Sequence, residues 1–569
     1  MRKIILLLTV SALSYITTSA QSTFTSSLAA KAKGDANIYG VVECDGKPVE
    51  GVAVSDGYKI VLTDRKGQYC FHSEKRNGNV FISIPGGYEA LRNGNDVVPQ
   101  FWAELSSDIE EIERHDFALK AVDNDRHVIV ALADIHIANH HNDLPSFRDV
   151  FVPKLNKELE PYRNAGIPVY SFCLGDSTHE LYWYDYLYDI GDFRNTLAEI
   201  RYPTPLFNTL GNHDHDGATP CDENTDFNSA AKYRKAFGPT YYSVNIGKAH
   251  YIMLDNMHFI NTPGGKVAKG IVGKRNCRVE LSTEQMEWLK KDLELVTDKD
   301  APLFIGVHYP IYKYSNEMDG EIYCSLPEPC GSQLTELLRP FTNVHVISGH
   351  AHRNRTTYGS DDSSKPEIAN IIEHNIVAVA GCLWHSSAYG GPMLGSFGEP
   401  AGCEIFTIDN KDMEWYFNPT QVPSNEQFRC FDMNSVREYF RNSGEARVFI
   451  DHFPKRTDYA RWDIENAVMI NVWNWGNDWK IKVTENGKEL KVERRNAENP
   501  QMLIGIDIPD ILWNQNFTNG KNKCKMSQNM FHVTASAPDT DLEITVTDRF
   551  GNEYHQTMVR PKAFHLHMK

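Results

Sequence analysis

The sequence has no Cys-x-x-Cys pair, no excess of basic side chains and no long apolar run after its first twenty residues. Without Cys-x-x-Cys spacing, neither a zinc ribbon nor a thioredoxin-like site is supported. The net charge of −17 argues against a nucleic-acid duplex as partner, because binding its backbone depends on basic patches. Without an apolar stretch of about 20 residues, we expect no later segment to span a bilayer.

The sequence also lacks internal repeats with a fixed period and low-complexity tracts. Its 569 residues, 41% of them apolar and 23% charged, are typical of a soluble globular protein with two or three cores. The negative net charge does not exclude a phosphate substrate, because bound divalent metals can make the local electrostatic field positive. The sequence does not indicate an oligomeric state.

The first twenty residues have the order of a secretory signal peptide. Met1-Arg2-Lys3 is basic, residues 4–10 are apolar, and Thr18-Ser19-Ala20 is small. We expect cleavage after Ala20 and a secreted or periplasmic protein. A membrane anchor is disfavoured, because the apolar run is far short of about 20 residues.

Eleven cysteines are present, and disulfides are permitted in an exported protein. Cys324 and Cys330 are close enough in sequence to close a small loop. The connectivity stays open, because spacing alone does not determine it. Cys173 lies inside an apolar strand run, and we predict that it is a buried free thiol.

The pattern along the chain predicts three domains after the signal peptide at 1–20. Residues 35–120 carry short β-branched runs separated by turn signals, which indicates a small β-sandwich. Residues 127–420 alternate strands and helices, which favours an α/β core. Residues 425–569 are β-rich again, with a hairpin signal at Asn486-Gly487.

Within these domains the expected helices lie at 147–164 and 185–200. Expected strands of the α/β core lie at 127–133, 168–174, 205–210, 250–254, 303–307, 344–347, 376–383 and 404–408. In the C-terminal domain we expect strands at 468–472, 479–483, 503–508, 531–535 and 542–546.

Polar side chains follow five of the central strands, at the point where each strand ends. They are Asp134 and His136, then Asp176, then Asn212, His213 and Asp214, then His308, and finally His350 and His352. Because ligands of α/β sheets bind outside the carboxyl ends of the strands, we expect these groups at one edge. Glycines at 175, 211 and 349 let the chain turn sharply there.

The donor types indicate a metal site. Asp and Asn oxygens combined with His nitrogens, without thiolates, suit Mn, Fe or Zn rather than a structural zinc. Asp134-x-His136 and His350-x-His352 place alternate residues on one side of an extended segment. Each pair can therefore face one metal or two adjacent metals.

The five motifs, in this order, resemble the calcineurin-like metallophosphoesterases over roughly residues 127–410. The flanking β-domains are similar to those of a bacterial branch of that family. The resemblance implies an α/β fold, a four-layer αββα sandwich flanked by two β-sandwich domains. It also implies two divalent metals. One is held by Asp134, His136 and His352, the other by Asn212, His308 and His350, with Asp176 bridging them.

The same resemblance makes His213 the catalytic acid and Asp214 the residue that orients it. Two metals about 3.5–4 Å apart lower the pKa of a shared water towards 7, so a bridging hydroxide attacks phosphorus. His213 then protonates the leaving oxygen. One departure is visible: many members have Gly-Asp-x-x-Asp, whereas this chain has Gly175-Asp176 followed by Ser-Thr-His-Glu180. The departure concerns outer or substrate contacts, not the metal ligands.

We therefore predict an exported phosphomonoesterase or phosphodiesterase acting on a small-molecule, glycan or lipid phosphoester. Hydrolysis of a phosphosulfur or pyrophosphate linkage is a second enzymatic reading. The alternative class is a non-enzymatic glycan-binding module with a degenerate central domain, which the intact donor set argues against. Residues 381–402, rich in Gly, Ser and Pro, could border the pocket and set specificity.

Overall fold

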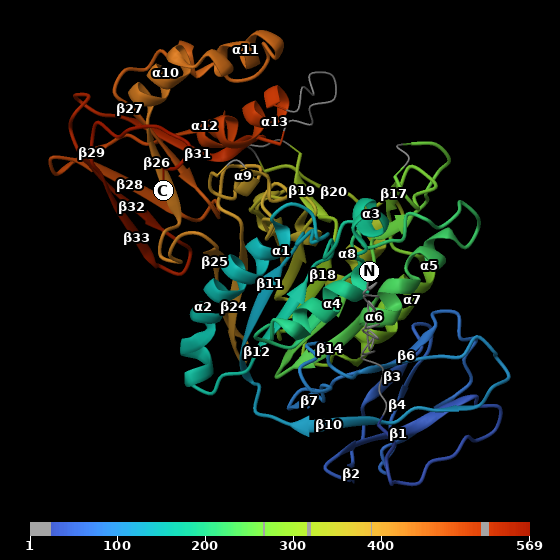
Figure 1. The fold of residues 1–569 in the computed structure, drawn as a ribbon. Coiled ribbons are helices and arrows are strands. Elements are labelled where there is room, and N and C mark those ends of the chain that lie inside the picture. The colour runs from blue at the N-terminus through green and yellow to red at the C-terminus, as the bar shows by residue number, and fades with distance from the viewer. Residues whose placement is uncertain (1–23, 266–267, 316–319, 389, 514–522, 569) are drawn as a thin grey trace, which may run out of the picture.

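The computed structural model describes residues 24–265, 268–315, 320–388, 390–513 and 523–568. The predicted signal peptide at 1–20 lies outside them. The described chain runs through an N-terminal β-rich region, a central α/β region and a C-terminal region of strands and helices (Figure 1). This order confirms the predicted fold class. The exact domain boundaries at 35–120, 127–420 and 425–569 stay predictions.

The N-terminal region contains two small sheets. In the first, β1 has β2, β10, β5 and β9 as neighbours and β7 pairs with β10, whereas the second has the order β4-β3-β6-β8. The strands are β1 (Ile38–Cys44), β2 (Lys47–Pro48), β3 (Ala53–Ser55), β4 (Ile60–Leu62), β5 (Gln68–Phe71), β6 (Asn79–Ser83), β7 (Tyr88–Ala90), β8 (Trp102–Glu104), β9 (Glu113–Arg114) and β10 (Phe117–Ala121).

This region shares one continuous apolar core with the central region. Trp102 on β8 is 1% exposed, and a side chain added at Gly238 would meet its ring within 2.6 Å. The guanidinium of Arg194, on helix α4 of the central region, forms a buried ion pair with Asp96. The N-terminal sheets are thus fixed to the α/β core rather than tethered to it.

The first central sheet has the order β13-β12-β11-β24-β25. Strands β11, β12 and β13 are parallel, and β24 and β25 close the sheet in antiparallel fashion. The bounds are β11 (Arg126–Leu132), β12 (Val169–Cys173), β13 (Leu206–Asn208), β24 (Gly402–Asp409) and β25 (Asp412–Pro419). The parallel strands therefore end at the same edge.

The second central sheet has the order β14-β15-β18-β21-β23-β22. Strands β15, β18, β21 and β23 are parallel. The bounds are β14 (Tyr242–Ile246), β15 (Ala249–Met253), β18 (Leu303–Val307), β21 (Val344–Ser348), β22 (Arg355–Tyr358) and β23 (Ile371–Asn375). Two hairpins lie outside the sheet, β16 (Met257–Phe259) with β17 (Cys277–Val279) and β19 (Tyr312–Tyr314) with β20 (Ile322–Cys324).

The two central sheets pack face to face through aromatic rings. The ring of Tyr251 on β15 lies 4.9 Å from Phe172 on β12 and 4.7 Å from Phe304 on β18. Helices cover the outer faces, giving the predicted helix–sheet–sheet–helix order (Figure 1). The helical elements of the central region are α1 (Asp143–Ser146), a π-helical turn η1 (Phe147–Phe151), α2 (Val152–Asn164), η2 (Glu180–Tyr182), α3 (Trp183–Tyr186), α4 (Ile190–Glu199), α5 (Thr225–Ser229), α6 (Ala231–Phe237), α7 (Thr283–Leu295), α8 (Cys330–Leu338), η3 (Gly359–Asp361), η4 (Pro366–Ile368) and α9 (His385–Ala388).

The C-terminal region stacks two four-stranded sheets beneath a layer of helices (Figure 1). Asn486 and Gly487 both have positive φ between β28 and β29, as the hairpin signal predicts. The strands are β26 (Phe428–Asp432), β27 (Ala467–Val472), β28 (Lys480–Glu485), β29 (Lys488–Leu490), β30 (Glu493–Glu498), β31 (Met526–Thr534), β32 (Leu542–Thr547) and β33 (Glu553–Met558). The helices are α10 (Met433–Asn442), α11 (Gly444–His452), η5 (Tyr459–Arg461), α12 (Pro500–Met502), η6 (Leu503–Asp507) and α13 (Ile508–Trp513).

Three predicted elements are wrong. Residues 503–508 are helical rather than extended, because the Asn499 side chain accepts hydrogen bonds from the backbone of Gln501 and Met502 and Pro500 begins the helix. The expected helix at 185–200 breaks at Leu187, which has φ +52°, and restarts at a capping box. Residues 376–383 leave the sheet, and their buried apolar side chains explain the false strand signal.

All eleven cysteines lie within the described residues and are free thiols. Cys173 is fully buried as predicted, and burial raises the pKa of its thiol to about 12. Among the described residues, no helix has the length and apolar character needed to cross a bilayer.

Candidate metal centre

The predicted ligands come together where the two central sheets end. Asp134 and His136 follow β11, and Asp176 and Asn212 follow β12 and β13 of the first sheet. The remaining three, His308, His350 and His352, follow β18 and β21 of the second sheet. All seven side chains therefore lie at the shared carboxyl edge, and six of them form two groups of potential metal donors.

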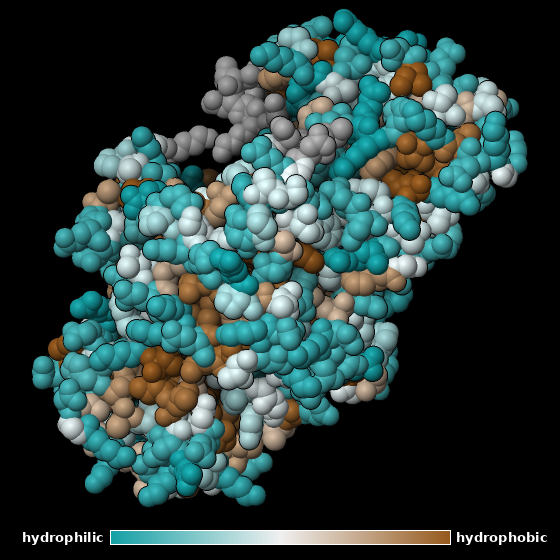
Figure 2. Space-filling view, turned by 180° about the vertical axis from the view of Figure 1, so that it is seen from behind, coloured by the Kyte–Doolittle hydropathy of each residue, from teal (hydrophilic) through white to brown (hydrophobic). Residues whose placement is uncertain are grey.

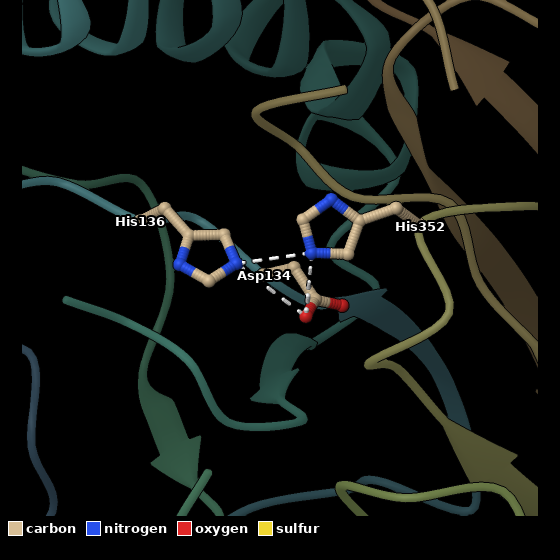
Figure 3. A group of neighbouring side chains, drawn as sticks. All are labelled: Asp134, His136 and His352. Atoms are coloured by element: carbon tan, nitrogen blue, oxygen red, sulfur yellow. Dashed lines mark hydrogen bonds and ion pairs between the residues drawn. The ribbon is translucent and has the colours of Figure 1, made fainter. Parts of the chain in front are cut away.

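Asp134, His136 and His352 form the first group (Figure 3). Nε2 of His136 lies 3.0 Å from Nε2 of His352, and Oδ1 of Asp134 is 3.7 and 3.3 Å from these two atoms. Oδ2 of Asp134 accepts a hydrogen bond from the backbone of His350, whereas Oδ1 is buried without a hydrogen-bond partner. Three donor atoms thus converge on one point.

The second group contains Asp176, His308 and His350, with Asn212 beside them. Nε2 of His308 and Nδ1 of His350 are 3.1 Å apart, and Oδ1 of Asn212 lies 3.0 and 2.9 Å from them. Oδ2 of Asp176 is 3.3 Å from Nε2 of His308 and 3.7 Å from Nε2 of His136 in the first group. One carboxylate therefore lies between both groups.

Hydrogen bonds on the far side of two imidazoles fix their tautomers. Nδ1 of His308 donates to the carbonyl of Leu174 at 2.8 Å, and Nδ1 of His352 donates to the carbonyl of Gly381 at 2.8 Å. Once Nε2 has lost its proton, each ring directs the lone pair of this atom to the centre, which is the usual arrangement of metal-binding histidines. The donor set and the unsatisfied Asp134 oxygen thus fit a pair of divalent cations, and the individual ligand roles stay predictions.

The electrostatics of the centre favour positive charge. Burial opposes the charged form of His308, but the Asp176 carboxylate raises the pKa of this ring to about 9. Burial and the neighbouring His308 lower the pKa of His350 to about 3. Despite burial, nearby histidines hold the pKa of Asp176 well below its usual range. The carboxylates therefore remain ionised and available to a cation.

Five of the seven predicted ligands have a left-handed backbone. The φ values of Asp134, His136, Asp176, His350 and His352 are +52°, +49°, +52°, +65° and +51°. Such values are uncommon outside glycine and cost free energy, so they cluster at functional sites.

The expected role of the three glycines is correct only for Gly175, whose φ is +86°. Gly211 and Gly349 are required by close approach instead. A side chain at Gly211 would meet the Asp176 backbone nitrogen at 2.1 Å, and one at Gly349 would meet Asp134 Oδ2 at 2.7 Å.

The structure contradicts the predicted partner of His213. Asp214 directs its buried carboxylate to the backbone nitrogens of Ser177, Thr178 and Gly211 at 3.2, 3.0 and 3.2 Å. It is a loop brace, because three amides surround its oxygens. Nδ1 of His213 instead meets Oε2 of Glu180 at 2.6 Å.

Glu180 is the functional residue that the sequence reasoning missed. It is 1% exposed, and its other oxygen is held by Arg275 at 2.5 Å. Burial lowers the pKa of His213, but Glu180 and Asp176 outweigh this effect and raise it to about 9. The signal was present in the segment where the chain departs from Gly-Asp-x-x-Asp, because the acid stands one position later.

Three further residues lie close to these motifs in the sequence and have different surroundings in the structure. The His179 ring lies 4.1 Å from the His213 ring, beside the centre. His215 is fully buried, hydrogen-bonded to Ser229 and stacked on Phe259, which makes it structural. Arg353 lies over the ring of Phe397 at 5.0 Å.

Three family models match the chain. The model described as calcineurin-like phosphoesterase matches residues 127–354. The models described as the N terminal and the C terminal of calcineurin-like phosphoesterase match residues 36–122 and 373–554. Together they cover the three regions of the fold in the same order. No curated protein matches the chain.

Among solved structures, a dimetal phosphatase from Danio rerio is 14% identical, with 52% of this chain and 97% of that chain covered and a TM-score of 0.30. Purple acid phosphatase PPD1 from yellow lupin is 14% identical, with coverage of 66% and 73% and a TM-score of 0.34. A sulfate thiohydrolase from Thermus thermophilus is 9% identical, with coverage of 52% and 58% and a TM-score of 0.27.

Proposed function

We propose that this chain, which belongs to the calcineurin-like phosphoesterase family, is an exported hydrolase that cleaves phosphoesters with two divalent metal ions. Family membership makes it a metal-dependent phosphoesterase. The observation that carries the two-metal proposal is the pair of donor groups joined by Asp176. Oxygen and imidazole donors without thiolate favour Mn, Fe or Zn.

The residues of the centre would hold two metal ions. Asp134, His136 and His352 would hold one ion, and Asn212, His308 and His350 the other, with Asp176 shared between them. When bound, such ions lower the pKa of water and stabilise charge on the phosphoryl oxygens. The carbonyls of Leu174 and Gly381 keep the imidazole lone pairs directed at the ions.

His213 supplies the proton that the leaving oxygen needs. Its side chain is 29% exposed, so one edge reaches solvent or substrate. Glu180 accepts from Nδ1 and stabilises the protonated ring, which leaves Nε2–H free to donate. Arg275 fixes Glu180 in turn. This chain of contacts supports general-acid catalysis on phosphomonoesters and phosphodiesters with poor leaving groups.

The test is a panel of phosphomonoesters, phosphodiesters and nucleotides, assayed together with elemental analysis of the same sample. We expect turnover of at least one ester class by protein that contains about two equivalents of Mn, Fe or Zn. Fully metal-loaded protein that cleaves no ester would favour the glycan-binding alternative. Turnover confined to phosphosulfur or pyrophosphate linkages would favour the second enzymatic reading.

Export is a separate proposal, supported by the basic, apolar and small residues at 1–20. We expect the mature protein to begin at Gln21. Mass spectrometry of the protein recovered from the native host's periplasm or medium tests this. An intact Met1 in those fractions would contradict cleavage.

A further inference from the structure

A pocket of about 300 Å³ opens beside the first donor group. Its walls come from three separate segments that meet next to His136. The lining residues are His136, Ala138, His140, His141, Asp143, His179, Tyr182, Leu383, Trp384 and His385. The predicted specificity loop at 381–402 therefore does contribute to a pocket at the centre.

The pocket lies on the side of the centre where a leaving group would depart. His179 lines it, and the His179 ring lies 4.1 Å from the ring of His213. The His213 ring is also 5.3 Å from that of His136. Because His213 is the proposed proton donor, the group attached to the leaving oxygen must extend towards this pocket.

One wall is held in shape by Asp143. Its carboxylate accepts hydrogen bonds from the backbone of Ala138 at 2.7 Å and of His140 at 3.0 Å. The His140 ring stacks on Tyr182 at 4.5 Å and contacts His141 at 3.8 Å. This wall is therefore preformed and aromatic.

The opposite wall is fixed by a strained turn. Leu383 and Trp384 both have left-handed φ, +62° and +59°. Nε1 of Trp384 donates to the carbonyl of Ile135 at 3.0 Å, which ties the turn to the metal-binding loop. The turn delivers His385, the first residue of α9, which lies next to the C-terminal helices (Figure 1).

The C-terminal region reaches the pocket through His385. Nδ1 of His385 lies 3.7 Å from Oδ1 of Asp510 on α13, and the other Asp510 oxygen lies 3.7 Å from Nζ of Lys523. The C-terminal region thus positions a pocket residue, although it contributes none of the seven predicted metal ligands.

The chemistry of the lining favours an uncharged polar occupant. No lysine or arginine is among the described residues that line the pocket, so a second phosphate would find no cationic side chain in its walls. Burial lowers the pKa of His385 to about 4, so at neutral pH its imidazole has one donor and one acceptor. Such groups suit hydroxyls.

We propose that this pocket receives a hydroxyl-rich, uncharged leaving group, so that the preferred substrates are phosphomonoesters of a monosaccharide or polyol. The inference rests on the proposed phosphoesterase function. The pocket volume is at the lower end of ligand sites, about 300–1,000 Å³, which suits one sugar ring. His140 and His385 recognise the hydroxyls from opposite walls, and Tyr182 closes the aromatic side.

The test compares wild-type protein with His385→Phe and His140→Phe, which retain an aromatic ring but remove its nitrogens. Substrates are glucose 6-phosphate, fructose 1,6-bisphosphate, AMP and methyl phosphate. We expect wild type to prefer glucose 6-phosphate. Each variant should raise the KM for glucose 6-phosphate by about 3- to 10-fold, the usual loss for one neutral hydrogen bond, and should raise the KM for methyl phosphate by less. His555→Ala, on an exposed hairpin far along the chain, is the matched control.

Saturation-transfer NMR with free glucose separates the pocket from the chemistry. Sugar binding that is lost in His385→Phe supports the pocket even if no ester is cleaved, in which case only the proposed function fails. Hydrolysis of methyl phosphate without glucose binding, or a preference for AMP or the bisphosphate, would overturn the pocket assignment alone. Equal losses on all substrates in both variants would also overturn it.

Discussion

Oε2 of Glu180 lies 2.6 Å from Nδ1 of His213, whereas Asp214, the next residue after His213, faces three backbone amides. The carboxylate adjacent in sequence is thus structural, and the one 33 positions away controls the histidine. Substitutions of Glu180 and of Asp214 should therefore have different effects.

Glu180→Gln should lower kcat on an alkyl phosphoester by roughly 10- to 100-fold, the usual cost of losing an outer partner of a functional histidine. The cause is a less stable protonated His213. Metal content should not change. Steady-state kinetics with elemental analysis measures this, and the Glu180→Gln/His213→Asn double variant should lose little more than His213→Asn alone. Additive losses in the double variant would show that Glu180 and His213 act independently.

Asp214→Asn should destabilise the protein by about 1–3 kcal/mol, because an amide group replaces an acceptor facing backbone N–H groups. Any loss of activity relative to wild type should be equal for an alkyl phosphoester and a nitrophenyl phosphoester. Urea unfolding followed by circular dichroism, together with the two-ester comparison, tests this. A loss on alkyl esters alone would restore Asp214 as the orienting residue.

His213→Asn should reduce kcat on an alkyl phosphoester by about 10²–10⁴-fold, the usual contribution of general-acid catalysis. The loss should be smaller on a nitrophenyl ester, because that leaving group departs without a proton. His308→Asn is the matched comparison, since it should lose metal and fail on both esters. Metal loss in His213→Asn would make that residue a ligand.

Asp176→Asn should reduce the metal content from near two equivalents to below one, because a single Asp176 oxygen faces both donor groups. The backbone should tolerate the change, since asparagine accepts a left-handed φ. Elemental analysis after supplementation is the measurement, with the exposed Asp149→Asn as control. Retention of two equivalents would contradict a shared carboxylate.

Asp96→Ala should cost about 3–5 kcal/mol, because it leaves Arg194 charged and buried without its partner. Asp149→Ala removes an exposed pair with Arg148 and should cost no more than about 1 kcal/mol. The measurement is the shift, relative to wild type, of the first unfolding transition in urea for each variant. Similar small shifts for both would show that the N-terminal sheets are not fixed through this pair.

The meeting of the seven predicted donor side chains at one edge could be predicted, because each follows an apolar strand and carries its chemistry in its residue type. His308 needed no local motif beyond the end of its strand. The contact of Glu180 with His213 could not be predicted, since it depends on the path of the loop between Asp176 and Glu180. Similarly, the helix at 503–508 was missed because apolar composition outweighed the Asn499-Pro500 start signal.

The shared core of the N-terminal and central regions was equally hidden. Pattern analysis separates segments by the period of their apolar residues, and it gives no information on which surfaces meet. Trp102 and Gly238 lie far apart in sequence, and neither carries a signal of their contact. Tertiary packing between regions therefore had to come from the structure.

The left-handed backbone at five of the predicted ligand positions restricts how this centre can change over evolution. Asparagine and glycine adopt such φ values readily, whereas valine, isoleucine and threonine do so only with strain. In a lineage that loses catalysis, substitutions to Asn or Gly can therefore remove the metal-binding side chains while the protein still folds. Descendants that only bind sugars should carry those two residues at 134, 136, 176, 350 or 352.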